Sequence, residues 1–252
     1  MKRGQITTYL LIGLLLFFII TAIIYLKTYF TQRSQASEIE ASIAISPQVQ
    51  PIRDSLQECI QTTLIDALRL VGLHGGYLAT PEPFLKTTLS TVAYWFYNGK
   101  DTKPKLKKIE EEISTYLQIA VPFCITDELF PGFTFSRGEV SATTTIKKDI
   151  VSTSVSYPVT ASKDNTQYTL PKKYTVSVRV RLGYMYSVAE GIIVNAKKRP
   201  DALDISYLAD SSYNIGVYPQ QDRIFLYVLT DKTMPLQETP YTLLFAYYQL
   251  QQ

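Results

Sequence analysis

The 252-residue sequence predicts an α+β protein with an N-terminal transmembrane helix and stalk, a helical region, and a mostly antiparallel β-rich region. Three patterns predict this class. An uncharged apolar run occupies the N-terminus, apolar residues at spacings of three and four follow it, and alternation of polar and apolar residues dominates the last part. We expect the anchor and stalk at residues 1–46, the helical region at 47–130 and the β-rich extracytoplasmic region at 131–252.

The anchor is the uncharged run from Ile6 to Leu26, which Lys27 closes. At about 1.5 Å per helical residue this run reaches roughly 30 Å, the thickness of a bilayer's hydrocarbon core. An ordinary secretory signal is shorter and is cut a few residues beyond its apolar region, whereas the small-residue site nearest this run, residues 34–36, lies well past it. The run therefore predicts a single-pass membrane helix.

Three helical segments are expected before residue 130. The anchor should continue as a stalk from Gln32 to Ile45, and a second helix should start near Pro51 and end at glycines 72, 75 and 76. A third should follow Pro104, with Lys107/Glu111 and Lys108/Glu112 at ion-pair spacing. Their apolar faces are Ile52, Leu56, Cys59, Ile60, Thr63, Leu64, Ala67 and Val71 for the second, and Leu106, Ile109, Ile113, Tyr116, Leu117 and Ala120 for the third.

Between the second and third helices, the segment from Phe84 to Tyr97 is compatible with either a helix or a strand. Its tip holds the densest aromatic cluster of a chain that has 19 Tyr, 11 Phe and one Trp. Tyrosine-rich surfaces suit contact with partners, although tyrosine also simply favours strands. We expect the cluster to be partly buried against the helical half and treat it as a candidate contact surface, made of Tyr94, Trp95, Phe96 and Tyr97.

From Phe133 onward the period changes to two, which predicts strands. A hairpin loop is expected at residues 162–166 and a helix from Tyr184 to Lys198. The pattern leaves open whether the strands form one sheet or two. The expected strands are Val140–Ile146, Ile150–Val159, Tyr174–Leu182, Tyr213–Tyr218, Ile224–Leu229 and Tyr241–Tyr248.

The chain has two cysteines, Cys59 and Cys124, and one histidine, His74. These are too few ligands for a Cys/His tetrahedral metal site. We expect a disulfide, which would close a loop of about 65 residues and stabilise the fold by roughly 4 kcal/mol. The alternative is a pair of buried free thiols. A disulfide requires an oxidising compartment, which would place the residues beyond Leu26 outside the cytoplasm and the N-terminus inside it.

The sequence predicts no catalytic site, no cofactor and no metal. His74 lies where a helix ends, a position that the helix dipole favours for any histidine. Residues Glu110–Glu112 point in different directions around a helix and are interpreted as a solvated face, as are the lysines between Lys100 and Lys108. A net charge of +3 is too weak and too scattered to indicate nucleic acid.

The stretch R-G-Q-I-T-T-Y-L-L-I-G-L-L-L-F, from Arg3 onward, resembles the class III signal of archaeal type IV pilin-like proteins. The overall layout is also similar to that of surface proteins from small-genome archaea. By resemblance, a prepilin peptidase would cut between Gly4 and Gln5 on the cytoplasmic side. Many members of the family carry Glu at the fifth mature position, where this chain has Tyr9.

Two functions of different class agree with these features. The first is a pilin-like surface subunit that assembles through its apolar helix, where Gly13 permits close packing with copies of itself or with other pilin-like subunits. The second is a permanently anchored adhesin or receptor, whose tyrosine-rich β half binds a cell-surface partner. Both require membrane lipid, and cleavage at Gly4 would distinguish them.

Overall fold

The computed structural model describes residues 20–21, 46–88, 90–198, 204–209, 211–220 and 223–248. Apart from residues 20–21 and 46, the predicted anchor and stalk lie outside this description. The chain divides into two units, Met1–Pro47 and Gln48–Gln252, and the fold below is that of the second. It is an α+β unit with a mostly antiparallel, β-rich C-terminal part, as the sequence predicts. Within the described ranges, no helix is long and apolar enough to cross a membrane.

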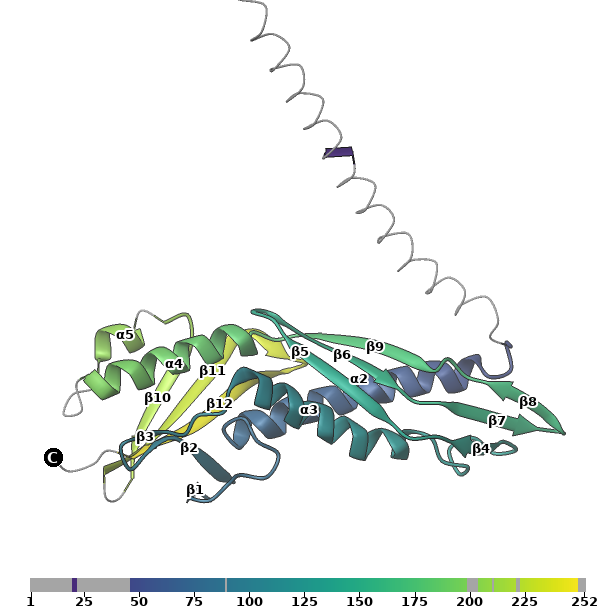
Figure 1. The fold of residues 1–252 in the computed structure, drawn as a ribbon, viewed down its shortest axis with the longest axis horizontal. Coiled ribbons are helices and arrows are strands. Elements are labelled where there is room, and N and C mark those ends of the chain that lie inside the picture. The colour runs from purple at the N-terminus through teal and green to yellow at the C-terminus, as the bar shows by residue number, and fades with distance from the viewer. Residues whose placement is uncertain are drawn as a thin grey trace, which may run out of the picture. The chain divides into compact units, whose positions relative to one another are not determined.

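Helix α2 (Gln50–Leu73) is the longest helix of this unit and contacts strands of two different sheets (Figure 1). Its predicted apolar face is buried except at Cys59, which is half-buried, and Ile65 and Leu68 widen it. The helix ends at His74, and the two glycines that follow adopt positive φ angles of 71° and 99°. The N–H of Gly76 donates to the carbonyl oxygen of Val71 at 2.6 Å, which terminates the helix.

Gly72 has a different role from the helix-ending one that the sequence suggested, because it lies inside α2. A Cβ atom at this position would collide with the carbonyl oxygen of Thr242. It would also lie 3.0 Å from the hydroxyl oxygen of Tyr241. The missing side chain therefore lets α2 pack directly against the backbone of strand β12 (Thr239–Tyr248).

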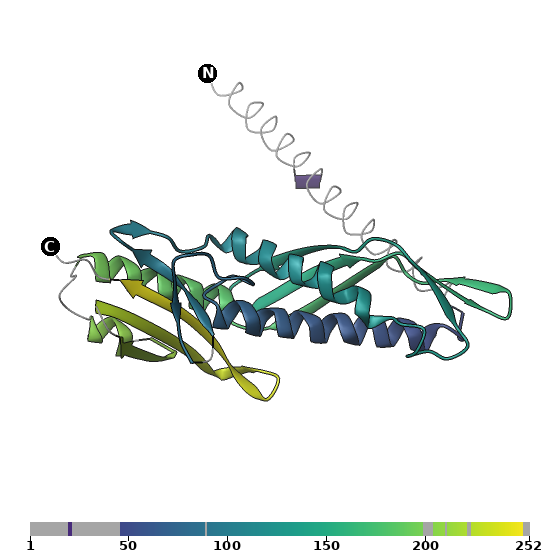
Figure 2. The ribbon, with the colours of Figure 1, turned by 90° about the horizontal axis from the view of Figure 1, so that it is seen from below.

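Helix α3 (Leu106–Ala120) and the 3-10 helix η1 (Val121–Cys124) run alongside α2 (Figures 1 and 2). Lys108 pairs with Glu112 at 2.7 Å as predicted, but Lys107 contacts Glu110, at 3.6 Å, instead of Glu111. The interpretation of all three glutamates as a solvated face is wrong for two of them. Glu110 accepts the N–H of Ile146 at 2.8 Å and Glu112 that of Leu78 at 2.9 Å, so both cap backbone groups.

A six-stranded sheet joins the beginning and the end of the unit. Its strands are β1 (Phe84–Lys86), β2 (Thr91–Tyr97), β3 (Lys100–Asp101), β10 (Asn214–Pro219), β11 (Ile224–Leu236) and β12. Their order is β1-β2-β12-β11-β10, with β3 also on β2, and every pairing is antiparallel except β2 with β12. The ambiguous segment 84–97 is therefore extended, and residues 47–130 supply three strands as well as helices.

Two three-stranded sheets form one interrupted ribbon. One has the order β4-β7-β8 and the other β5-β6-β9. The strands are β4 (Thr134–Arg137), β5 (Ser141–Ile146), β6 (Ile150–Ser156), β7 (Val159–Lys163), β8 (Thr166–Thr169) and β9 (Lys173–Arg179). Pro158 and Pro171 lie in the interruptions, where proline has no N–H to donate. The predicted hairpin at 162–166 is confirmed, with positive φ at Asp164 and Asn165.

Helices α4 (Leu182–Lys198) and α5 (Ile205–Ala209) lie above β10–β12 in Figure 1. The helix expected at residues 184–198 is therefore confirmed and begins two residues earlier. Beneath it, the Phe245 ring stacks on Trp95 and Tyr227, with ring centroids 4.7 and 5.0 Å apart. Tyr186 of α4 completes this core and donates its hydroxyl to the carbonyl oxygen of Pro104 at 2.8 Å.

Candidate functional site

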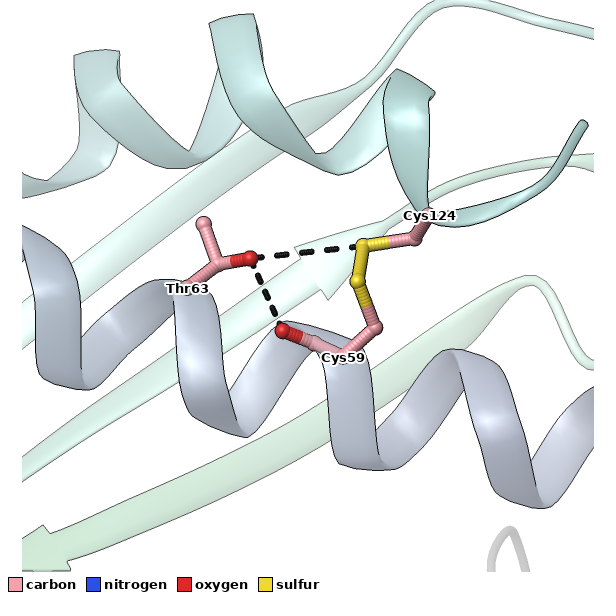
Figure 3. The surroundings of a disulfide bond; sticks show 3 residues. All are labelled: Cys59, Thr63 and Cys124. Carbon is pink, nitrogen blue, oxygen red and sulfur yellow. Dashed lines mark hydrogen bonds between the residues drawn. A yellow bond between two sulfur atoms is a disulfide. The ribbon is translucent and has the colours of Figure 1, made fainter.

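The disulfide expected from the sequence is present and excludes the alternative of two free thiols. It ties Cys59 of α2 to Cys124 at the end of η1, with the two Cα atoms 5.8 Å apart (Figure 3). The Thr63 hydroxyl donates to the carbonyl oxygen of Cys59 at 2.8 Å and lies 4.0 Å from the Cys124 sulfur. The disulfide thereby closes a loop from residue 59, in the N-terminal half of α2, to residue 124.

The aromatic cluster at 94–97 is only partly available for contact. Trp95 is completely buried and Tyr94 is 7% exposed. The sequence predicted only partial burial of the cluster, so Trp95 is more deeply buried than expected. The Trp95 indole N–H donates to the carbonyl oxygen of Gly75 at 3.0 Å. Phe96 stacks on Tyr247, with centroids 5.0 Å apart, and Lys197 lies over its ring. Trp95 is thus a core residue and cannot serve as a contact surface.

The six-stranded sheet has a face that no helix covers among the described residues. In Figure 1, α4 and α5 lie above β10–β12, and no helix is drawn on the opposite side of these strands. The register places Tyr218, Leu226, Ala246 and Tyr94 in one row across four strands, and Val228 and Leu244 in the next. We call this surface, together with Tyr97 and Tyr248, the open face.

The open face is aliphatic at its centre and aromatic at its margin. Leu244 and Ala246 are buried, whereas Leu226 and Val228 are only partly buried. The rings of Tyr94, Tyr97 and Tyr248 adjoin one another, with successive centroids 4.9 and 5.3 Å apart. Burial raises the pKa of Tyr94 above its ordinary value, and the neighbouring Tyr97 and Tyr248 raise it further.

No charged side chain belongs to the open face, although Lys100 of β3 lies opposite Tyr97 at its border. The most exposed member is Tyr218, at 54%, on the edge strand β10. An apolar centre with a margin of hydroxyl-bearing aromatic rings is the composition of a protein contact surface. It offers no nucleophile, general base or metal ligand, so it is suited to binding and not to chemistry.

A polar site, separate from the open face, joins the ribbon to the six-stranded sheet. Arg181 makes two hydrogen bonds to the Asp231 carboxylate, at 2.7 and 2.6 Å, and its guanidinium lies 4.7 Å from the Tyr213 ring centroid. Asp231, only 1% exposed, also accepts N–H groups from Thr233 and Met234. Desolvation raises the pKa of Asp231, but these hydrogen bonds together outweigh it and hold the pKa below its ordinary value.

Sequence reasoning missed this buried pair. Arg181 stands in the alternation of residues 175–181, in which Arg179 also takes a polar position, so both arginines read as solvent-facing. Only Arg179 is exposed. No signal in the sequence links Arg181 to a carboxylate fifty positions later, because the two meet through the packing of different sheets.

The other residues that we considered for chemistry have structural roles. His74 Nδ1 lies 2.8 Å from the carbonyl oxygen of Leu78. Lys103 pairs with Asp101 and Glu190, at 2.9 and 3.6 Å. Within the described part of the chain, no group of three or more His, Cys, Asp or Glu side chains could hold a metal ion. The predicted processing and membrane residues Gly4, Gln5, Ile6, Gly13 and Leu26 lie outside the described ranges.

Comparison of the chain with protein-family models, with curated proteins and with solved structures finds no match.

Proposed function

We propose that this chain is a membrane-anchored surface subunit, which exposes residues 48–252 outside the cytoplasm and assembles through its apolar N-terminal helix. The proposal combines an uncharged run from Ile6 to Leu26, long enough to span a bilayer, with a disulfide-tied outer unit. The N-terminus would be cytoplasmic and the protein would cross the membrane once.

The Cys59–Cys124 disulfide is the observation that carries the extracytoplasmic part of this proposal. Cytosolic thiols are kept reduced, so a structural disulfide favours an oxidising compartment. Both cysteines of the chain are used in this bond. Because the bond lies beyond the apolar run in the sequence, it supports an orientation in which the run's C-terminal end faces outward.

Assembly is the part of the proposal that the N-terminal residues support. The Arg3-Gly4-Gln5 junction resembles the processing site of pilin-like proteins, and cleavage there would leave the apolar helix as the mature N-terminus. Gly13 would let neighbouring helix backbones approach closely, and the surrounding Leu, Ile and Phe side chains would supply packing surface. Copies of the chain would then associate through these helices.

A second function, a permanently anchored adhesin or receptor, is favoured by the open face. Its uncovered row of Tyr218, Leu226, Ala246 and Tyr94 would suit a partner on another surface, because tyrosine offers a large contact area at low conformational cost. In this case Gly4 would not be a cleavage site, and the apolar run would act only as an anchor.

Intact mass and N-terminal sequencing of the protein from its native membrane test the proposal. A chain that begins at Gln5 and occurs in sheared filaments is expected for the subunit. The change Gly4→Leu should then abolish cleavage and filaments, whereas Gly13→Leu should leave cleavage intact and weaken only assembly. A chain that begins at Met1 and stays with membranes at high salt supports the anchored binding protein. Recovery in the cytosolic fraction with Cys59 and Cys124 reduced would refute both functions.

A further inference from the structure

We propose that the open face is a docking surface for a second copy of this chain, packed sheet against sheet. The surface lies wholly in strands β2, β10, β11 and β12, so this inference does not depend on cleavage at Gly4, but it rests on the membrane anchor of the proposed function to concentrate the copies. It adds a contact between outer units to whatever association the helices provide.

The layering of the fold gives the first argument. A sheet that is apolar on both faces needs a layer against each of them. One face of this sheet is covered by α4, whose Met185, Ala189 and Ile192 are buried and whose Tyr186 ring contacts Trp95 of β2. The other carries Leu226, Val228, Leu244 and Ala246 with no helix over it among the described residues. Two such faces can pack at about 10 Å, as the layers of a β-sandwich do.

The absence of charge on the open face favours a second copy of the chain as the partner. The eight side chains of the open face carry no charge, so two copies brought face to face meet no like-charge repulsion at the centre. A strongly acidic or basic partner would find no opposite charge there, apart from Lys100 at the border. A two-fold axis places the same patch on both copies, and an uncharged aliphatic centre is self-complementary. At the margin, Tyr97, Tyr218 and Tyr248 are at least partly exposed.

The area of the face indicates how strong the contact is. A standard stable interface buries about 800 Å² per partner and uses roughly 20–30 residues on each side. The open face has eight members, and Leu85, Val92 and Ile224 belong to the same apolar cluster. Five of these eleven side chains are already mostly buried: Leu85, Val92, Tyr94, Leu244 and Ala246. The contact is therefore too small to hold dilute copies together. It becomes populated when copies are concentrated on one surface, where the effective concentration is high.

Tyrosine cross-linking tests the contact in the full-length protein. The protein is reconstituted into phosphatidylcholine liposomes and illuminated with a ruthenium photosensitiser and persulfate. Each of two adjacent tyrosines loses one electron to photogenerated Ru(III), and one proton to water, and the two radicals couple through a new C–C bond. Persulfate is the final electron acceptor. We expect covalent dimers whose linked peptides carry Tyr218, Tyr97 or Tyr248.

Matched variants separate this contact from random encounter. A lysine at the centre, Leu226→Lys, should lower the dimer yield at least about tenfold, because an unpaired charge would have to be buried. Val194→Lys, at a 47% exposed position on α4, should leave the yield unchanged. Tyr218→Phe should lower the yield, whereas Tyr184→Phe, which removes a 42% exposed tyrosine on α4, should not.

Folding of each variant is verified by an intact disulfide and by the emission of the buried Trp95. If Leu226→Lys fails to fold, Tyr218→Lys replaces it, because the Tyr218 side chain is mostly in water and should tolerate the change. The proposal is overturned if no covalent dimer forms, if the linked peptides carry Tyr184, or if the charged variant of the open face dimerises as well as Val194→Lys.

Discussion

Replacing Arg181 by methionine should be one of the most damaging single changes in this protein. Methionine keeps much of the side-chain length but removes the guanidinium that makes two hydrogen bonds to Asp231, at 2.7 and 2.6 Å. The carboxylate is 1% exposed, so water cannot replace the lost donors. Breaking a buried ion pair in this way typically costs about 3–5 kcal/mol.

The surroundings of Asp231 place the cost near the lower end of that range. Three donors remain: the N–H and hydroxyl of Thr233, both at 2.9 Å, and the N–H of Met234 at 3.1 Å. We therefore expect Arg181→Met to lower the free energy of unfolding by about 3 kcal/mol. The double variant Arg181→Met/Asp231→Leu should cost less than the sum of its single changes, with a coupling energy of about 2 kcal/mol.

Urea unfolding of the full-length protein in detergent micelles, followed by Trp95 fluorescence, measures these quantities. The same titration at several pH values tests the sign of the linkage. Because the pKa of Asp231 lies below its ordinary value of 3.8, its contribution is present above that pH and is lost as the pH falls through the lower folded value. Single changes that cost under about 1 kcal/mol each and add without coupling would refute the reasoning.

Three further predictions concern the disulfide and the tyrosines. Cys59→Ala/Cys124→Ala should lower the free energy of unfolding by about 4 kcal/mol, and reduction of the wild-type protein should match it, because each releases the loop between residues 59 and 124; a loss below about 1 kcal/mol contradicts this. Tyr241→Phe should not destabilise the fold, because the Tyr241 hydroxyl is buried without a partner in the described structure. Tyr186→Phe should cost about 1 kcal/mol, because it removes the hydrogen bond to the carbonyl oxygen of Pro104. Thermal unfolding compares the two variants, and equal losses of stability would contradict this difference in hydrogen bonding. Burial raises the pKa values of Tyr186 and Tyr227 to about 12, so the free energy of unfolding should fall as the pH rises from 10 towards 12. An absorbance titration at 295 nm measures tyrosine ionisation. Full ionisation of all tyrosines near pH 10, with the fold intact, would exclude this burial effect.

Local patterns in the sequence predicted much of the fold. The apolar spacing from Ile52 to Val71 identified α2, because one side of a helix repeats every three or four residues. The alternation at residues 174–182 identified β9 for the equivalent reason in strands. The disulfide also followed from the sequence, since only one pairing of two cysteines exists.

The features that escaped prediction depend on contacts between distant segments. Segment 84–97 was ambiguous because four consecutive side chains of β2, at residues 92–95, are buried, so the strand lacks a clean alternation of polar and apolar residues. Glu110 and Glu112 resembled a solvated face because the backbone N–H groups that they accept belong to Ile146 and Leu78. The open face is likewise assembled from four strands, and its residues form no continuous motif in the chain.

The interior position of β12 has a consequence for biosynthesis. This strand lies between β2 and β11, and it is the last described element of the chain. Until β12 has been synthesised, the sheet lacks this central strand, and β2 and β11 each present an unpaired edge. Such edges readily pair with other chains. The unit can therefore complete its fold only once β12 has left the ribosome, and a chain stopped before Thr239 should aggregate instead of forming a shorter stable protein.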